Sequence, residues 1–156
     1  MAALINRHGL VAADPWQRIA DAAELAVAPG RHLLLPLPLW TAHRQALAGR
    51  DRALGVWLRP DDEPAVLRTA IATLALIAVD FPCFTDGRGY SLGKLIRERY
   101  GYAGDLRAIG DILRDQVYFL SKCGFSSFAL RADQSPDEAL AALHDYRWSP
   151  RPGGSR

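Results

Sequence analysis

Short apolar runs alternate along the chain with stretches whose apolar residues have helical spacing. Each run has the length and the aliphatic or aromatic content of a buried strand. Pro36 and Pro38 remove backbone donors from the first run, so its second half is expected to be irregular. The five predicted strands are residues 32–40, 53–58, 74–81, 106–111 and 125–130.

Capping residues and turn glycines mark the helices between these runs. An N-cap residue followed by proline, as in Asp14-Pro15, is typical of a helix start, and a glycine such as Gly101 or Gly124 is typical of a helix end. The predicted helices span residues 15–25, 42–48, 65–73, 92–100, 112–123 and 136–146, with N-terminal caps or starts at Asp14, Thr41, Asp62, Ser91 and Ser135.

This alternation predicts an α/β fold, with a mainly parallel sheet of about five strands built from βαβ units. Two short strands around Gly9 add an N-terminal hairpin. An open sheet with helices on both faces is the first expectation, and a half (βα) barrel is the alternative, because periodicity fits both. We expect one domain over residues 1–148 and a flexible tail over residues 149–156, which are rich in Pro, Gly, Ser and Arg.

Polar residues gather where the predicted strands end. Ligands bind beyond the carboxyl ends of parallel strands in either architecture, so these residues are expected to share one rim. The loop at residues 80–91, DFPCFTDGRGYS, is its most prominent part. The candidate binding residues are Asp80, Thr85, Gly87, Arg88, Gly89, Tyr90, Ser91, Arg114, Asp115, Gln116 and Arg131, and the candidate catalytic residues are Asp86 and Asp111.

A small oxyanion is the ligand that this rim suggests. Gly87 and Gly89 would let the backbone approach a ligand, and a helix beginning at Ser91 would present free N–H groups to an anion. Arg88 and Arg114 could add bidentate contacts. The structural alternative is a glycine-rich turn in which Asp86 pairs with Arg88 and Ser91 serves only as a cap.

The rim carboxylates have two interpretations. Carboxylates that converge at strand ends can act as general acids and bases or bind magnesium. Each single one is more simply a cap, a loop acceptor or an ion-pair partner. The histidines are dispersed and no HExxH motif occurs, so we expect no metal. The four carboxylates concerned are Asp80, Asp86, Asp111 and Asp115.

Composition and sequence motifs limit the classes of partner and cofactor that we expect for this chain. The net charge of +2 is spread along the chain without a basic run, so nucleic acid is not expected. The N-terminus lacks a signal-peptide pattern and the apolar segments are shorter than the ~20 residues that span a bilayer, so a cytoplasmic protein without membrane contact is expected. No complete GxGxxG or P-loop motif occurs, and we expect no cofactor.

Cys83 and Cys123 are expected to be reduced thiols, with Cys83 more simply structural than reactive. The sequence is compatible with a homodimer as well as with a monomer.

Several segments carry a family resemblance. Residues 74–130, which include FTDGRGYS and GDILRDQ, resemble the bacterial domain-of-unknown-function family 934, and LPLPLW and LGVWLRPDDEP fit the same family. Members often carry an oxidoreductase label and are typically encoded beside the sulfite reductase haemoprotein and the phosphoadenylyl or adenylyl sulfate reductase. The resemblance therefore implies a place in assimilatory sulfate reduction, without implying particular catalytic residues.

Three functions follow from the residues and the resemblance together. The first is a non-redox accessory protein of sulfite reduction that binds the sulfite reductase haemoprotein or its substrate through the rim. The second is an enzyme for a small anionic substrate, with Asp86 or Asp111 as the acid or base and Arg88 and Arg114 as anion clamps. The third is an oxidoreductase, which would require a flavin or a nicotinamide.

Overall fold

The computed structural model describes residues 3–29, 32–47 and 53–145, and its strands form one eight-stranded sheet. The order across the sheet is β2-β1-β8-β7-β6-β5-β4-β3. Strands β3 to β8 are parallel, and the hairpin of β1 and β2 continues the sheet antiparallel to β8. The strands are β1 (Leu4–Asn6), β2 (Gly9–Leu10), β3 (Trp16–Arg18), β4 (His32–Pro36), β5 (Ala53–Leu58), β6 (Leu76–Phe81), β7 (Asp105–Gly110) and β8 (Ser127–Ala129).

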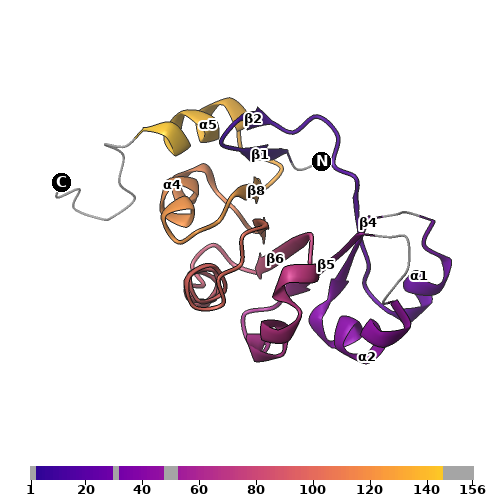
Figure 1. Ribbon diagram of the computed structural model, residues 1–156. Helices are drawn as coiled ribbons and strands as arrows, with labels where there is room; N and C mark the ends of the chain where they lie inside the picture. The colour runs from indigo at the N-terminus through magenta and orange to yellow at the C-terminus, as the bar shows by residue number, and fades with distance from the viewer. Residues whose placement is uncertain (1–2, 30–31, 48–52, 146–156) are drawn as a thin grey trace.

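The parallel strands lie side by side in the order in which they occur in the chain. Because βαβ crossovers are right-handed, a sequential order places every crossover helix on the same face of the sheet. Figure 1 shows the helices along the outside of a curled sheet. The fold is therefore a half barrel. The expected mainly parallel sheet and the N-terminal hairpin are confirmed, but the expected five strands with helices on both faces are wrong.

The helices are short and of three kinds. The α-helices are α1 (Ala22–Val27), α2 (Leu37–Leu47), α3 (Arg88–Lys94), α4 (Arg114–Lys122) and α5 (Pro136–His144). Two 3₁₀ helices, η1 (Pro64–Thr69) and η2 (Ile71–Thr73), connect β5 to β6, and a π-helix, η3 (Leu95–Arg99), continues α3. No helix in the described ranges is long and apolar enough to cross a bilayer.

The two faces of the sheet bury different cores. Successive side chains of a strand point to opposite faces, so Ile77, Val79 and Phe81 of β6 pack under the helices in the main core. Leu76 and Ala78 of the same strand point to the concave face and form a smaller core, together with Leu34, Trp57 and Ile109. The concave face therefore has side chains packed along its floor.

The segment between β2 and β3 passes along the concave side, opposite the helices (Figure 1). Its Asp14 forms an ion pair of 3.2 Å with Arg107 of β7, whose side chain is only 8% exposed. Arg107 also contacts Asp105 and the Ser127 hydroxyl. Residues 11–15 thus connect the two edges of the half barrel across its open side.

The prediction of a helix after Asp14-Pro15 is wrong for residues 16–18, which form the edge strand β3. The Asp14 carboxylate accepts a hydrogen bond from the Trp16 N–H, at 3.3 Å, as it would at a helix start. Aspartate makes this local bond in turns as well as in helix caps, so the sequence signal is the same in both. The helix begins later, at α1, where the Asp21 side chain accepts from the Glu24 N–H.

The expected cap at Thr41 is also wrong, because α2 begins at Leu37, directly after Pro36 of β4. Pro38 falls in the first turn, where its missing N–H costs no helical hydrogen bond. Thr41 lies within the helix, and its hydroxyl donates to the Leu37 carbonyl at 2.8 Å. Residues 65–73 are helical as expected, but as two 3₁₀ turns with Glu63 as the cap.

Most other elements match the sequence. Strands β5 to β8 fall within or one residue beyond their expected ranges, and Gly101 and Gly124 adopt the positive φ of helix ends. Gly9 has the positive φ of the hairpin turn. Ser135 caps α5 by accepting from the Glu138 N–H. The predicted tail, residues 149–156, lies outside the described residues.

Candidate functional site

The loops that follow β6, β7 and β8 meet at the carboxyl edge of the sheet. We call residues 82–91 and 111–116 with Arg131 the strand-end rim. Asp111 accepts a hydrogen bond from the Phe84 N–H through Oδ2, at 2.9 Å, and from Arg131 through Oδ1, also at 2.9 Å. The Gln116 amide donates to the Phe84 carbonyl and contacts the Tyr90 hydroxyl, both at 3.0 Å. The structure thus joins residues that are far apart in sequence.

The arginines of the rim are paired with carboxylates. Arg88 forms a bidentate pair with Asp86, with Nη2 2.8 Å from Oδ2 and Nε 3.1 Å from Oδ1. Arg131 forms a similar pair with Asp133 and also contacts Asp111. These guanidinium groups already have anionic partners, so the oxyanion clamp expected from the sequence would have to displace them.

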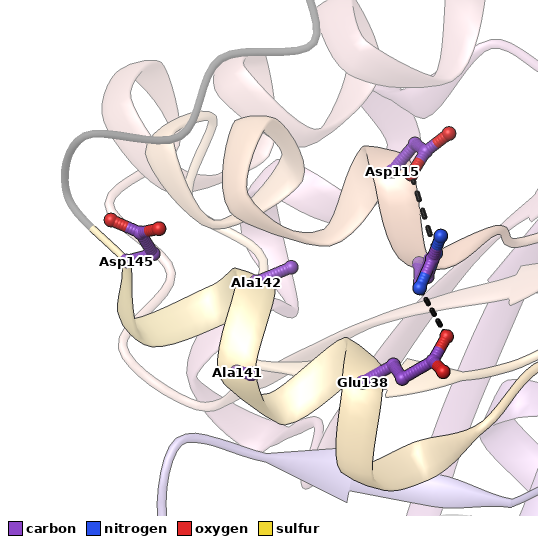
Figure 2. Close-up of a pocket in the computed structure, with 6 residues that line it drawn as sticks. Asp115, Glu138, Ala141, Ala142 and Asp145 are labelled. Carbon is purple, nitrogen blue, oxygen red and sulfur yellow. Dashed lines mark hydrogen bonds and ion pairs between the residues drawn. The ribbon is translucent and has the colours of Figure 1, made fainter.

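Arg114 faces α5 instead of the other rim arginines. Its guanidinium contacts Glu138, and its Nε lies 3.6 Å from Asp115 Oδ1. Figure 2 shows Glu138 and Asp115 on either side of this guanidinium group. The three residues lie at one end of a cavity of about 270 Å³ between α4 and α5. The main-chain N–H of Arg114 donates to the Gln134 side chain at 2.8 Å. Arg114 therefore connects α4 to α5, and among the described residues neither Arg114 nor Asp115 joins the hydrogen bonds at Phe84.

The glycines and Ser91 do not have the roles that the sequence suggested. Helix α3 begins at Arg88 with Gly87 as its N-cap, so Ser91 lies in the middle of the helix and does not cap it. Gly89 packs against the ring of Phe81, which would lie 2.4 Å from an added Cβ. Gly89 therefore brings the helix close to the sheet, and its missing side chain is not needed for a ligand.

The candidate acid–base residues are both held by other groups. The Arg88 side chain lowers the pKa of Asp86 by hydrogen bonding, so this carboxylate stays ionised down to a lower pH than usual. Both oxygens of Asp111 accept hydrogen bonds, and the N-cap of α4 is Leu113 in place of the expected Asp111. These arrangements favour the structural interpretation of the two carboxylates over general acid–base catalysis.

Thr85 and Cys83 lie at the outer part of the loop. The Cys83 thiol and the Thr85 hydroxyl are 3.1 Å apart, and this hydrogen bond lowers the pKa of the exposed thiol. Cys123 is partly buried, and burial raises the pKa of its thiol. In the described ranges, no group of three or more His, Cys, Asp or Glu side chains is placed to hold a metal ion.

Aromatic side chains are the unexpected feature of the rim. Phe84 is 45% exposed although both its N–H and its carbonyl are hydrogen bonded by side chains, from Asp111 and Gln116. Phe119 on α4 is 44% exposed, and its ring lies 5.4 Å from that of Tyr90. We call Phe84, Tyr90 and Phe119 the aromatic patch. Apolar periodicity alone does not show which aromatic side chains are exposed, so Phe84 and Phe119 could not be identified as surface residues from the sequence.

Asp80 belongs to a different surface. It alternates with Leu76 and Ala78, so its carboxylate is on the concave face, beside Gly110. The charged groups near it are Arg18 and Arg59, which act on its pKa through their positive charges. Both guanidinium groups stack on Trp57. This cluster was not expected from the sequence, because Arg18 falls within the helix predicted over residues 15–25.

Replacing Asp80 with asparagine is expected to stabilise the protein at neutral pH. Burial raises the pKa of Asp80 above 3.8, and the positive charges of Arg18 and Arg59 oppose only part of that rise. A carboxyl with a raised native pKa stabilises the fold fully below 3.8 and loses that contribution as the pH rises through its native pKa. Thermal unfolding at neutral pH should therefore give a higher Tm for Asp80→Asn, with a smaller difference below pH 3.8.

Asp133→Asn is the control with the opposite sign. The Arg131 side chain lowers the pKa of Asp133 to about 2, so its stabilising contribution is present above 3.8 and is lost as the pH falls. This variant should lose stability at neutral pH. If Asp80→Asn behaved in the same way as Asp133→Asn, attraction by the two arginines would outweigh burial at Asp80, contrary to the prediction.

More than half of the chain matches a known family model. Residues 55–150 match the family model described as "Bacterial protein of unknown function (DUF934)". The matched region includes most of β5 and all of β6, β7 and β8, and therefore the whole strand-end rim. No curated protein matches the chain.

Proposed function

The chain belongs to DUF934, a family of bacterial proteins of unknown function, and we propose that it is an accessory protein of assimilatory sulfite reduction. In this proposal the strand-end rim is its contact surface and the sulfite reductase haemoprotein is its partner. The role is non-redox, in keeping with a sequence that has no complete nucleotide-binding motif. The setting comes from the family resemblance, and the mode of action comes from the rim.

The observation that carries the proposal is the fixed, exposed ring of Phe84. An exposed aromatic side chain on a mobile loop would lose conformational entropy on binding. Here Asp111 and Gln116 hold the backbone of Phe84 on both sides, so the loop is already ordered. Aromatic residues that are rigid before binding are typical anchors of protein interfaces.

The charges around the aromatic patch support protein docking over anion capture. Asp86 with Arg88 and Asp133 with Arg131 are neutralised as pairs within the chain. A polar margin around an apolar centre is the usual arrangement of a protein interface. Binding a small oxyanion at the same arginines would require these bidentate pairs to open. We therefore assign the rim to a protein partner.

Phe84→Ala is expected to weaken binding to the sulfite reductase haemoprotein by at least about tenfold, as for truncated aromatic anchors in other interfaces. The change removes the ring while both backbone hydrogen bonds of residue 84 can remain, so the fold should be preserved. Purified proteins would be compared by isothermal titration calorimetry, and circular dichroism would confirm that the variant is folded.

Val27→Ala is the matched control, because Val27 is another exposed apolar residue and lies on α1, away from the rim. It should bind as the unchanged protein does. The proposal fails if the unchanged protein does not associate with the haemoprotein, or if Phe84→Ala and Val27→Ala bind equally well.

A further inference from the structure

The concave face carries two arginines that converge on one tryptophan ring. Arg18 lies at the end of β3, and Arg59 follows the end of β5. Their guanidinium carbons are 4.1 Å and 4.6 Å from the centre of the buried Trp57 ring. The Trp57 indole is itself fixed, because its N–H donates to the Ile19 carbonyl at 3.3 Å. Stacking therefore holds both cations in place near the carboxyl ends of the strands.

Among the described residues, these two cations differ from the other site arginines because neither forms an ion pair with a carboxylate. Arg88, Arg107, Arg114 and Arg131 each form at least one ion pair with a carboxylate. Within the described part of the chain, neither the Arg18 nor the Arg59 guanidinium has an ion pair or a hydrogen bond to another side chain. Both are exposed, so their N–H groups remain available to a ligand.

Asp80 completes the cluster from the neighbouring strand. Its carboxylate is half-buried and feels the charges of Arg18 and Arg59, yet within the described residues no ion pair of 4.0 Å or less joins it to either one. One acceptor group and two cationic donors therefore lie near one another at the same end of the sheet. The three residues come from the ends of three different strands, where half-barrel and barrel folds assemble their ligand sites.

Arg18 also lines a cavity of about 360 Å³ on the concave face. The cavity is apolar at Leu34 and Ile109 and polar at Asp14 and Arg107. Arg107 is already held by Asp14, Asp105 and Ser127, so Arg18 is the cation of this wall that can bind a ligand. A ligand held by Arg18 thus has room for an apolar extension.

We propose that Arg18, Arg59 and Asp80 form a binding site for a small oxyanion that carries a proton. The two guanidinium groups donate hydrogen bonds to its charged oxygens, and the Asp80 carboxylate accepts one from its hydroxyl group. A fully deprotonated oxyanion would leave Asp80 facing a like charge without a shared proton, so the site should select against it. This site is separate from the strand-end rim and does not depend on docking to a partner protein.

Isothermal titration of the full chain with inorganic phosphate, inorganic sulfate and phenylphosphonate, which like phosphate keeps a proton to a large extent at neutral pH, tests the proposal. Phosphate keeps a proton at neutral pH and should bind more tightly than sulfate. Arg18→Met and Arg59→Met should each weaken phosphate binding by at least about tenfold, since each removes charge-assisted hydrogen bonds. The methionine retains an apolar stem over Trp57. Because the two arginines lie on different strands, either variant can serve if the other does not fold.

Arg44→Met is the matched control. Arg44 also stacks on a tryptophan, at 5.2 Å from the Trp40 ring, but it lies on α2 and outside the cluster. It should leave phosphate binding unchanged, whereas Asp80→Asn should reduce the preference for phosphate over sulfate. Tighter binding of phenylphosphonate than of phosphate would indicate an organic phosphate or phosphonate whose body occupies the cavity, and equal binding would indicate a free oxyanion.

Two results would overturn the assignment. One is the absence of saturable binding of all three probes up to about 10 mM, which is weaker than a functional site of this kind requires. The other is an unchanged affinity for phosphate in both arginine variants, once circular dichroism has shown that both variants are folded.

Discussion

Arg97→Met is expected to lower the free energy of unfolding by about 3 kcal/mol, because several charge-assisted hydrogen bonds are lost together. Arg97 lies in η3, and its Nη1 donates to the Tyr102 and Gly104 carbonyls at 2.7 and 2.8 Å. Its Nε donates to the Gly124 carbonyl at 2.8 Å. Without the guanidinium, these three partly buried carbonyls would lose their donors, while the methionine would keep much of the apolar stem.

The position of Arg97 explains why one residue has so large an effect. Tyr102 and Gly104 precede β7, and Gly124 precedes β8, so the guanidinium joins the loops that enter two neighbouring strands. Nη2 also approaches the Ser126 hydroxyl, which in turn hydrogen bonds to the Leu106 N–H and to Asp105. Arg97 therefore fixes the amino edge of the sheet at β7 and β8.

Chemical denaturation measures this prediction. Arg99→Met is the control, because Arg99 is exposed on the same helix and, among the described residues, makes no hydrogen bond or ion pair. It should change the free energy of unfolding by no more than about 0.5 kcal/mol. A loss of less than about 1 kcal/mol in Arg97→Met would show that water replaces the guanidinium at the carbonyls.

The alternation of strands and helices could be predicted from the sequence, but the side on which the helices lie could not. A continuous apolar run predicts a buried strand such as β6, and such a run occurs equally in an open sheet and in a half barrel. The difference lies in the strand order, which depends on long-range pairing. The edge strand β3 is only three residues long and follows a local signal that is typical of a helix start, so it was missed.

For the candidate site, too, the sequence predicted which loops meet but did not decide which side chains pair with one another. The sequence predicted that loops after β6, β7 and β8 would meet, since this follows from parallel strands alone. The sequence also offered the pairing of Asp86 with Arg88 as the structural alternative, and the structure contains this pair. It could not show that Arg131 would pair with Asp133, nor that Arg18 and Arg59 would form no ion pair among the described residues. One available clue was the alternation in β5, because Trp57 and Arg59 must point to the same face of the sheet.

The two edges of the half barrel have different tasks in this interpretation. At the amino edge, Arg97 satisfies backbone carbonyls and its contacts are all internal. At the carboxyl edge, Phe84 is exposed on a fixed loop, and Arg18 and Arg59 are exposed beside a half-buried carboxylate. This division between a stabilising edge and a ligand-binding edge is the general one for parallel (βα) folds. Substitutions at the two edges should accordingly separate into stability effects and binding effects.

Gly89→Ala is expected to lower the free energy of unfolding by about 2 kcal/mol through overpacking. An added Cβ would lie 2.4 Å from Cε2 and Cζ of Phe81, whose ring is 1% exposed and packs against Tyr90 and Phe125. The ring has no free space to move into, so α3 must shift outward. Gly87→Ala is the control two residues earlier, where nothing lies within 4 Å of the added Cβ, and it should change stability by no more than about 0.5 kcal/mol.

A double substitution separates packing from ligand contact as the reason for Gly89. Phe81→Leu removes part of the ring that the new methyl group meets, so Phe81→Leu/Gly89→Ala should be more stable than the sum of the two single changes predicts, by about 1 kcal/mol. Additive losses would mean that the Phe81 ring is not the obstacle. If Gly89→Ala left unfolding unchanged and instead weakened binding to the haemoprotein, the glycine would serve the approach of a partner, as the sequence alone suggested for a ligand. The 2.4 Å contact leads us to expect the packing result.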